Sequence, residues 1–383
     1  MNDIFQLTLI LVASLVATLI ARRIRIPAVV GQILIGIVLA PAALGWLQGG
    51  HTIEVLSEIG VILLMFLAGL ESDLGVLKKN FKPALLVALA GVLVPLLVFW
   101  GVTTMMGYAF STAIFYGIVF AATSVSITVE VLQEYGKLST KAGSIILGAA
   151  VVDDILAVLA LSIFTSTQSS SGNLPKQFFM EFLFLLFLVL VHKSIPKVWR
   201  FVEKLPVYAK NTTAALILCL VLSLLADAAG MSAVIGSFFA GLALSQTDVS
   251  HKIEEYSSAI AYVVFIPVFF VSIAISVTFE SIFEHPILIL FFTLLAVLTK
   301  FIPAYFIGKS TGLTSSDSAL VGTGMVSRGE MALIIAQIGL ASQVINSDIY
   351  SELVIVIILS TLIAPFLIKL SLKKTKITII TDL

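Results

Sequence analysis

Long runs of apolar residues, separated by short polar stretches, repeat along the whole chain. Thirteen of these runs approach the roughly 20 residues that a helix needs to cross a bilayer. They cover residues 3–21, 28–46, 53–71, 83–106, 112–132, 141–165, 177–195, 212–228, 231–246, 257–277, 286–308, 317–341 and 350–372. The polar stretches between them are too short for a soluble domain. The pattern predicts an all-α polytopic membrane protein in which residues 1–383 form a single transmembrane domain, with no soluble regulatory domain.

The composition supports this class. Hydrophobic residues make up 59% of the 383 residues and charged residues only 11%, and the formal net charge is zero. Soluble proteins average about half apolar and a quarter charged residues, so this chain has more apolar surface than a soluble core could hide. The balanced charge gives no reason to expect nucleic acid as a partner. The lipid bilayer is the partner that this composition predicts.

The basic residues predict the orientation of the chain, because lysine and arginine favour cytoplasmic loops. With the N-terminus outside, the odd-numbered loops and the C-terminal tail hold all but three of the 22 basic residues. The exceptions are Lys176 in an even-numbered loop, and Lys300 and Arg328 inside apolar runs. We therefore expect the N-terminus outside and the C-terminus in the cytoplasm.

Charged residues also occur deep inside three of the apolar runs. They are Asp153, Asp154, Lys300, Arg328 and Glu330. Such charges can be structural pairs between helices, but intramembrane ionisable groups more often mark an ion or proton pathway. Neighbouring positions on a helix diverge by about 100°, so the two adjacent aspartates cannot face one partner equally. The five formal charges sum to minus one, and a bound cation or proton would balance the site.

Two stretches are unusual for membrane helices. "FAATSVSITVEVL" (120–132) concentrates serine and threonine, and "VGTGMVSRGEMALI" (321–334) concentrates glycine. Small residues can serve close helix packing. However, glycine weakens a helix, and Ser and Thr side chains can bond the backbone groups that an unwound turn exposes. The two stretches lie seven runs apart and therefore cross the membrane in opposite directions. Broken helices in opposite-facing copies are typical of inverted-repeat transporters.

Five stretches together resemble a known family. They are "GVILLMFLAGLESDL" (60–74), "AATSVSIT" (121–128), "VVDDILAVL" (151–159), "LTKFIPA" (298–304) and "MVSRGEMALIIAQIGL" (325–340). In this order they resemble the monovalent cation/proton antiporter-2 family, and within it the short bacterial sodium/proton antiporters with paired aspartates. The resemblance implies thirteen transmembrane helices with an inverted repeat and two crossing broken helices, at residues 123–128 and 325–330.

The resemblance also implies a division of labour among helices. A six-helix core would lie at about 83–165 and 286–372, and the remaining helices would form a dimer panel and a linker. We therefore expect a homodimer in the bacterial cell membrane.

Residue roles follow from the same resemblance. Asp154 would bind the cation and the proton, so it is also the expected metal ligand, while Asp153 would pair with Lys300. Arg328 and Glu330 would form a supporting pair at the second broken helix. Because hard cations prefer oxygen ligands, we expect Thr123 and Ser124 of the first broken helix to complete the site.

The function implied is secondary antiport of Na⁺, or of Li⁺ or K⁺, against H⁺ by alternating access. The ions are substrates and no cofactor is expected. A K⁺/H⁺ antiporter or a cation channel of the potassium-efflux type is the alternative. An intramembrane aspartyl protease is disfavoured, because adjacent acids on one helix cannot face each other across a substrate. We therefore expect a transporter and not an enzyme.

Several other acids lie near the ends of apolar runs. They are Glu71, Asp73, Glu130 and Asp227. Glu71 and Asp73 are interpreted as a solvated helix end, with a role in an ion funnel as the alternative. Glu130 could attract cations, but an acid at the membrane interface needs no function, and Asp227 is interpreted as a cap or turn residue.

Overall fold

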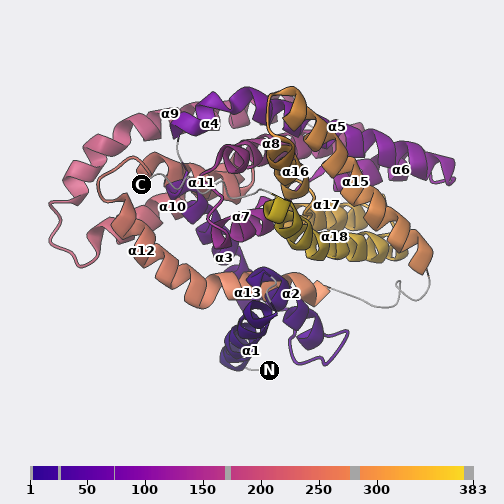
Figure 1. The fold of residues 1–383 in the computed structure, drawn as a ribbon, viewed down its shortest axis with the longest axis horizontal. Coiled ribbons are helices and arrows are strands. Elements are labelled where there is room, and N and C mark those ends of the chain that lie inside the picture. The colour runs from indigo at the N-terminus through magenta and orange to yellow at the C-terminus, as the bar shows by residue number, and fades with distance from the viewer. Residues whose placement is uncertain (1–2, 25–26, 73, 169–173, 277–284, 375–383) are drawn as a thin grey trace.

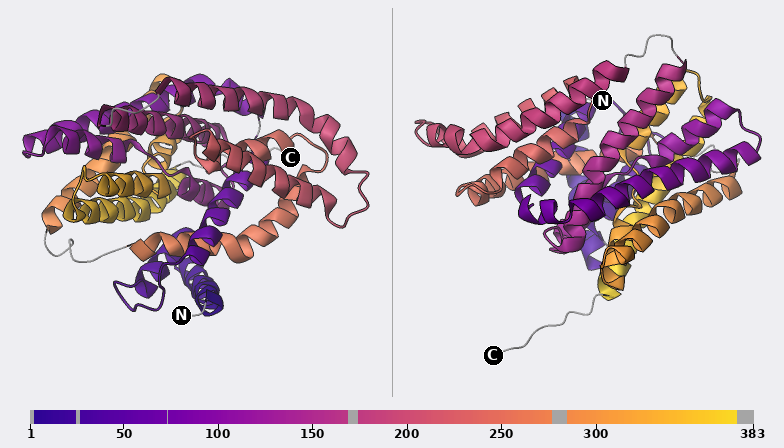
Figure 2. Two further views of the ribbon diagram at one scale, coloured as in Figure 1. Left: turned by 180° about the vertical axis from the view of Figure 1, so that it is seen from behind. Right: turned by 90° about the horizontal axis from the view of Figure 1, so that it is seen from above.

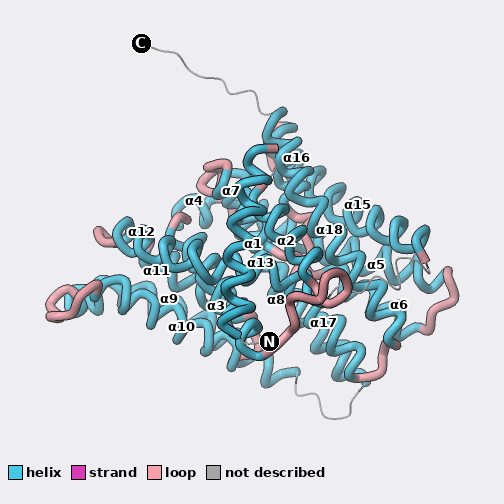
Figure 3. The backbone as a smooth tube through the Cα atoms, turned by 90° about the horizontal axis from the view of Figure 1, so that it is seen from below, coloured by secondary structure: helices cyan, strands magenta, loops and turns pink. Residues whose placement is uncertain are grey.

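The computed structural model describes residues 3–24, 27–72, 74–168, 174–276 and 285–374. Some side chains inside helices, that of Glu330 among them, lie outside this description, as does Asp73. The regular structure of the described residues is helical throughout (Figure 1, Figure 3). The predicted all-α class is confirmed.

Helices cover each of the thirteen predicted runs. In chain order they are α1 (Asp3–Arg23), α2 (Ala28–Leu39), α3 (His51–Leu70), α4 (Leu74–Lys79), α5 (Phe81–Met105), α6 (Phe110–Ala121), α7 (Val125–Glu134), α8 (Lys141–Gln168), α9 (Leu174–Val202), α10 (Lys210–Ala228), α11 (Ala233–Leu244), α12 (Ser250–Ile260), the π-helical turn η1 (Ala261–Phe265), α13 (Ile266–Ser272), the 3₁₀ turn η2 (Ile273–Ser276), α15 (Pro286–Ser310), α16 (Ser315–Gly324), α17 (Glu330–Ala341) and α18 (Ser347–Lys374). Within the described ranges, 9 helical stretches are long and apolar enough to cross a membrane, while α2 and α11 are apolar but shorter.

Several helix boundaries differ from the prediction, and α2 ends at Leu39 although the predicted run extends to residue 46. The short helix α4 was not predicted, α9 continues to Val202, and α12 begins at Ser250. In the last turns of α9, Ile195, Trp199 and Val202 are buried while the basic residues between them are exposed. Amphipathic turns of this kind extend a helix into the interface, and a search for apolar runs alone does not detect them.

One set of helices packs around α3. We call α1, α2, α3, α10, α11 and α13 the α3 group; α3 packs against α11 and α13, and α2 against α1 and α13. A Cβ atom at Gly69 would lie 2.1 Å from the carbonyl oxygen of Phe238, and one at Gly241 would lie 2.1 Å from that of Phe66. Only glycine therefore allows α3 and α11 to approach this closely, as is common between membrane helices.

A second set packs around α5. We call α5, α6, α8, α15, α16, α17 and α18 the α5 group; α5 packs against α6, α8 and α15, and α18 packs against α16 and α17. Aromatic side chains fill its interior, where Phe99 and Phe120 stack with ring centroids 4.1 Å apart. In Figures 1 and 2 the ends of α5, α6 and α15 lie on the opposite side of the molecule from α9, α10 and α12, with α7 near the middle.

Candidate ion-binding site

Two helices unwind in the middle of the α5 group, as predicted. The first break spans residues 122–124, between α6 and α7, and the second spans 325–329, between α16 and α17. The amide of Ser124 donates to the carbonyl oxygen of Ser327 at 2.9 Å, so the two breaks touch. The prediction of two crossing broken helices is confirmed, with breaks slightly different from the predicted 123–128 and 325–330.

Hydroxyl groups satisfy backbone atoms that the breaks expose. Ser327 Oγ donates to the carbonyl oxygen of Ser124 at 2.5 Å, and Thr128 Oγ1 donates to that of Gly324 at 2.7 Å. A Cβ atom at Gly329 would lie only 2.4 Å from Ser124 Oγ. The serine, threonine and glycine residues of the two stretches therefore serve the crossing itself, which explains their unusual concentration there.

Asp153 lies beside the first break and forms an ion pair. Lys300 Nζ lies 2.8 Å from Asp153 Oδ2, and both side chains are 0% exposed. Thr123 Oγ1 donates a hydrogen bond to the same carboxylate oxygen at 2.5 Å. α8, α15 and the first break thus each contribute one side chain to this contact, which the resemblance implied for Asp153 and Lys300.

Asp154 follows on α8 and has a different environment. Its exposed fraction is 9%, whereas that of Asp153 is 0%. One step along a helix turns the side chain by about 100°, so the two carboxylates point in different directions. The negative charge of Asp154 still acts on the Lys300 ammonium. The pair of aspartates therefore combines one acid in an internal ion pair with a second acid close to the same cation.

Arg328 projects from the second break and is fully buried. Its Nη1 donates to the carbonyl oxygen of Ala122 at 3.3 Å, and its Nη2 donates to that of Ala296 at 3.0 Å. Thr361 of α18 donates to the carbonyl oxygen of Arg328. Arg328 thereby ties both breaks to α15. The predicted partner Glu330 begins α17, but its side chain lies outside the described part of the chain.

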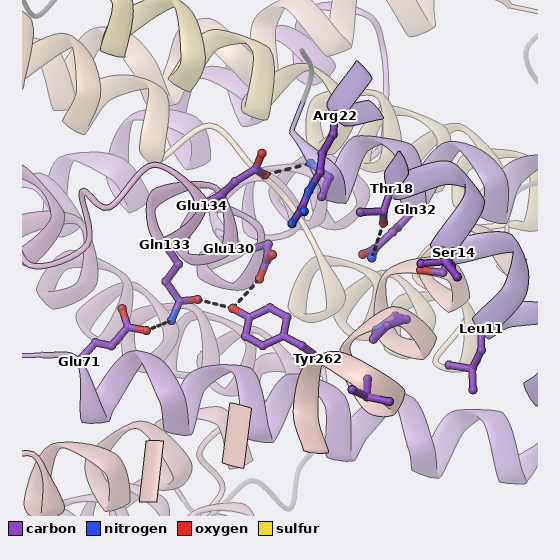
Figure 4. A pocket seen from close by; sticks show the side chains of 14 residues that line it. Leu11, Ser14, Thr18, Arg22, Gln32, Glu71, Glu130, Gln133, Glu134 and Tyr262 are labelled. Carbon is purple, nitrogen blue, oxygen red and sulfur yellow. Dashed lines mark hydrogen bonds between the residues drawn. The ribbon is translucent and has the colours of Figure 1, made fainter. Parts of the chain in front are cut away.

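Cavities lie near the two ends of α3. One, of about 770 Å³, is lined by Glu71, Glu130 and Tyr262 among others (Figure 4). The other, of about 690 Å³, is lined by Glu54, Glu58 and Asp227 among others. Glu71, Glu130 and Asp227, which the sequence did not assign to transport, thus line cavities, while Asp73 lies outside the described residues. Sequence reasoning missed Tyr262, because a lone tyrosine inside an apolar run carries no signal of such a role.

Comparisons with known proteins agree with this geometry. The family "Sodium/hydrogen exchanger, transmembrane" matches residues 10–374. An Na⁺/H⁺ antiporter of Enterococcus hirae is 49% identical over 379 residues, which cover 98% of this chain and 99% of the relative. The Na⁺/H⁺-K⁺ antiporter GerN of Bacillus cereus is 41% identical over 367 residues, or 95% of each chain.

A solved structure supports the fold independently. The sodium proton antiporter MjNhaP1 from Methanocaldococcus jannaschii superposes with a TM-score of 0.72, covering 96% of this chain and 97% of that chain at 18% identity. At this identity the likeness concerns the fold. The family match and the two bacterial relatives cover almost the whole chain, and on these grounds it belongs to the sodium/hydrogen exchanger family.

Proposed function

We propose that this chain exchanges Na⁺ for H⁺ by alternating access, with Asp154 holding the proton and the cation in turn. The observation that carries the proposal is the fully buried contact of Asp153 with Lys300, 2.8 Å long, directly beside a second carboxylate on the same helix. One acid is matched by a cation of the protein. We assign the other acid to the transported ions.

As a member of a family of sodium/hydrogen exchangers, the chain is a secondary transporter and not an enzyme. Sodium ions and protons are its substrates, and their exchange needs no cofactor. The energy for moving one ion comes from the gradient of the other.

The first break supports this assignment by supplying oxygen atoms. Hard cations prefer oxygen ligands. Residues 122–124 lie outside the helices, and the carbonyl oxygens of Ala122 and Ser124 keep a second lone pair beside the hydrogen bonds that they accept from Arg328 and Ser327. Thr123 and Ser124 add hydroxyl oxygens, although Thr123 gives its hydrogen to Asp153 in this conformation. We propose that Asp154 with Thr123 and Ser124 coordinates the cation and that Asp153 tunes the charge around it.

Coupling follows from competition for one group. A carboxyl group that carries a proton has lost the negative charge that attracts a cation, so proton and sodium exclude each other at Asp154. If only the loaded forms of the site can move between the two membrane faces, each movement of sodium one way requires a proton the other way. No second coupling device is needed.

The helix packing suggests which parts move. We propose that the helices at about 83–165 and 286–372 form the moving core and that the remaining helices form a dimer panel and a linker. The separate packing of the α5 group and the α3 group supports this division. We further propose a homodimer in the bacterial cell membrane. The proposed orientation, with the N-terminus outside and the C-terminus in the cytoplasm, rests on the distribution of basic residues.

The subfamily and the cation are also matters of proposal. The five stretches described above support the monovalent cation/proton antiporter-2 branch of the family. The printed name of GerN includes K⁺ as well as Na⁺, which keeps K⁺/H⁺ antiport as the second candidate. A channel of the potassium-efflux type is less favoured, because a pore has no need of a lysine paired with its acids.

Purified protein in proteoliposomes would test the proposal. A pH-sensitive dye inside the vesicles reports proton movement when Na⁺, Li⁺ or K⁺ is added outside. We expect Na⁺ to drive protons in the opposite direction. Dissipation of a cation gradient without countermovement of protons would instead establish a channel, and a response to K⁺ but not to Na⁺ would establish the alternative antiporter.

A further inference from the structure

Gly91 of α5 faces the ion pair of Asp153 and Lys300. α5 packs against α8, which carries Asp153, and against α15, which carries Lys300. A Cβ atom at Gly91 would lie 3.4 Å from Lys300 Nζ and 3.7 Å from Asp153 Oδ1. Gly91 itself is buried, whereas Leu89 and Leu93 of the same helix are exposed. α5 therefore covers the charged pair on one side with a single layer of helix.

Close helix packing does not explain this glycine. At Gly69, Gly117 and Gly236 a Cβ atom would lie 2.1–2.5 Å from a backbone oxygen of another helix, so those positions require glycine. At Gly91 the nearest atom is Lys300 Nζ at 3.4 Å, which is an ordinary contact distance. Alanine would therefore fit, and it would also favour the helix. Glycine thus leaves room beside the pair that the packing of α5 does not require.

One oxygen of the Asp153 carboxylate has hydrogen-bonding capacity to spare. Lys300 Nζ and Thr123 Oγ1 both donate to Oδ2, at 2.8 and 2.5 Å. Among the described residues no group donates to Oδ1, although this atom is buried. Buried polar atoms nearly always have a partner, either from the protein or from an ordered water. The ammonium of Lys300 carries three hydrogens, of which its contact with Oδ2 uses one. The pair therefore presents an acceptor and a donor next to Gly91.

The chemistry of these two atoms selects a water molecule as the ligand. A cation at this place would be repelled by the ammonium, and an anion would be repelled by the carboxylate. A neutral molecule that accepts from Lys300 Nζ and donates to Asp153 Oδ1 matches both, and these are the two polar partners that a buried water needs at least. A methyl group is larger than a water molecule, so room that admits the Cβ atom of alanine also admits one water.

We propose that Gly91 reserves a site for one water molecule between Asp153 Oδ1 and Lys300 Nζ, and that this water speeds the opening and closing of the ion pair during transport. Separating two buried charges is costly when neither finds another partner. A shared water keeps a hydrogen bond to each group as the two move apart. The role in transport rests on the proposed function, in which the pair adjusts the charge around the cation. Gly91 is a positioning residue, because it acts through the pair and does not touch the transported ion.

An experimental structure of the full chain, at a resolution that shows ordered waters, tests the site itself. We expect a water oxygen at about 2.7–3.0 Å from both Asp153 Oδ1 and Lys300 Nζ in the wild type. In Gly91→Ala the added methyl group takes the place of this water, which should then be lost. A wild-type structure that shows other buried waters but none at this position would overturn the proposal, whatever the transport measurements give.

Transport by the full chain in proteoliposomes tests the role of the water. The maximal rate of Na⁺-driven proton movement should fall about tenfold in Gly91→Ala, while the KM for Na⁺ stays within about twofold because the proposed cation ligands are untouched. Gly91→Ser adds a larger side chain, but its hydroxyl group both donates and accepts as the water does. Its maximal rate should therefore stay within about threefold of the wild type. Gly101→Ala and Gly101→Ser are the matched controls on the same helix, because nothing lies within 4 Å of a Cβ atom there.

The order of the two Gly91 variants separates a polar site from a packing role. If only the size of the side chain mattered, serine would slow transport more than alanine; that order, or equal rates in both variants, would overturn the role of the water and leave the proposed function intact. Transport by Asp154→Asn would overturn the proposed function, and the structural test of the water site would still stand. Thermal unfolding in detergent establishes that each variant is folded. If Gly91→Ala does not fold, the wild-type structure and Gly91→Ser decide.

Discussion

The ammonium group of Lys300 lies 2.8 Å from a carboxylate oxygen of Asp153, and neither side chain is exposed. An ion pair removed from water in this way loses much of its solvation energy, and removal of one partner leaves a buried charge. Such a pair is therefore poorly explained as a device for stability alone. Its position beside Asp154 and the two helix breaks suggests that the charges serve ion exchange.

Replacement of Asp154 by Asn should abolish exchange while the protein still inserts and folds. Asparagine keeps the shape of the side chain but neither binds a proton nor offers a charge to a cation. Na⁺-driven proton movement in proteoliposomes measures the effect. The exposed Asp227 provides the control Asp227→Asn, which should retain transport. Substantial exchange by the Asp154 variant would refute the assignment of this residue.

Replacement of Lys300 by Gln should separate transport from membrane potential. If the ammonium leaves Asp153 and releases a proton when the cation enters, two protons move against one sodium ion, and the exchange is electrogenic. We expect the variant to retain some exchange but to ignore an imposed potassium–valinomycin potential. A wild-type protein that already ignores this potential would show that Lys300 is a structural residue.

The same substitution also has a stability effect that can be separated. Leaving the Asp153 carboxylate without its partner should cost about 3–5 kcal/mol, unless the group becomes protonated. Asp153→Asn combined with Lys300→Gln removes both charges and should be more stable than Lys300→Gln alone. Melting temperatures of the wild type, both single variants and the double variant measure this coupling. Additive effects would show that the 2.8 Å contact contributes little.

A methyl group at Gly329 should disturb the crossing of the breaks. Its Cβ atom would lie 2.4 Å from Ser124 Oγ and 2.5 Å from Ser124 Cβ. We expect Gly329→Ala to weaken the apparent Na⁺ affinity about tenfold, which corresponds to the roughly 1.4 kcal/mol that overpacking commonly costs. Adding Ser124→Gly removes both clashing atoms and should restore part of the melting temperature, whereas the apparent affinity should stay low because the proposed Ser124 ligand is also lost. Gly101→Ala is the control, because nothing lies within 4 Å of a Cβ atom there. Equal affinities in all three variants would contradict a tight crossing.

The Glu71 carboxyl group should make the stability of the protein depend on pH. Burial raises the pKa of this group, and the charge of Glu254 adds to this, while the hydrogen bond from Gln133 opposes it. The folded state therefore binds the proton more tightly than the unfolded chain does, so the stabilisation is present at low pH and is lost as the pH rises. Between about pH 4.3, the ordinary carboxyl value, and the raised value, the wild type should lose melting temperature relative to Glu71→Gln. A constant difference across this range would contradict the expected shift.

Much of the architecture could be predicted because the membrane restricts the choices. Backbone groups in lipid must bond within a helix, so apolar runs of sufficient length predict helices well. The breaks were predictable because serine, threonine and glycine gather in two stretches that cross the membrane in opposite directions. Such residues also allow intact helices to pack closely, as Gly69 and Gly241 do, so their presence alone does not identify a break. The start of α12 at Ser250 and the helix α4 were missed because they are amphipathic and lie at the ends of apolar runs.

The pairing within the site could be predicted less directly. Nothing in the spacing brings Lys300 to Asp153 across 147 positions, and this contact was expected only through resemblance. The contact between Tyr262 and Glu130 was not expected at all. These residues are 132 positions apart, and each reads by itself as an ordinary interfacial side chain. Contacts of this kind depend on how helices pack, which a single sequence does not specify.

The crossing of the two breaks brings four helix ends together, and each end carries part of the peptide dipole. The first turns of α7 and α17 present partial positive charges, and the last turns of α6 and α16 present partial negative charges, each of roughly half an elementary charge. In sum these charges cancel. The crossed helix ends therefore add no net charge to the site, and its net charge is set by side chains such as Asp154 and Lys300. Rewinding one break would remove one partial charge of each sign, so such a variant should lose oxygen ligands without changing the net charge of the site.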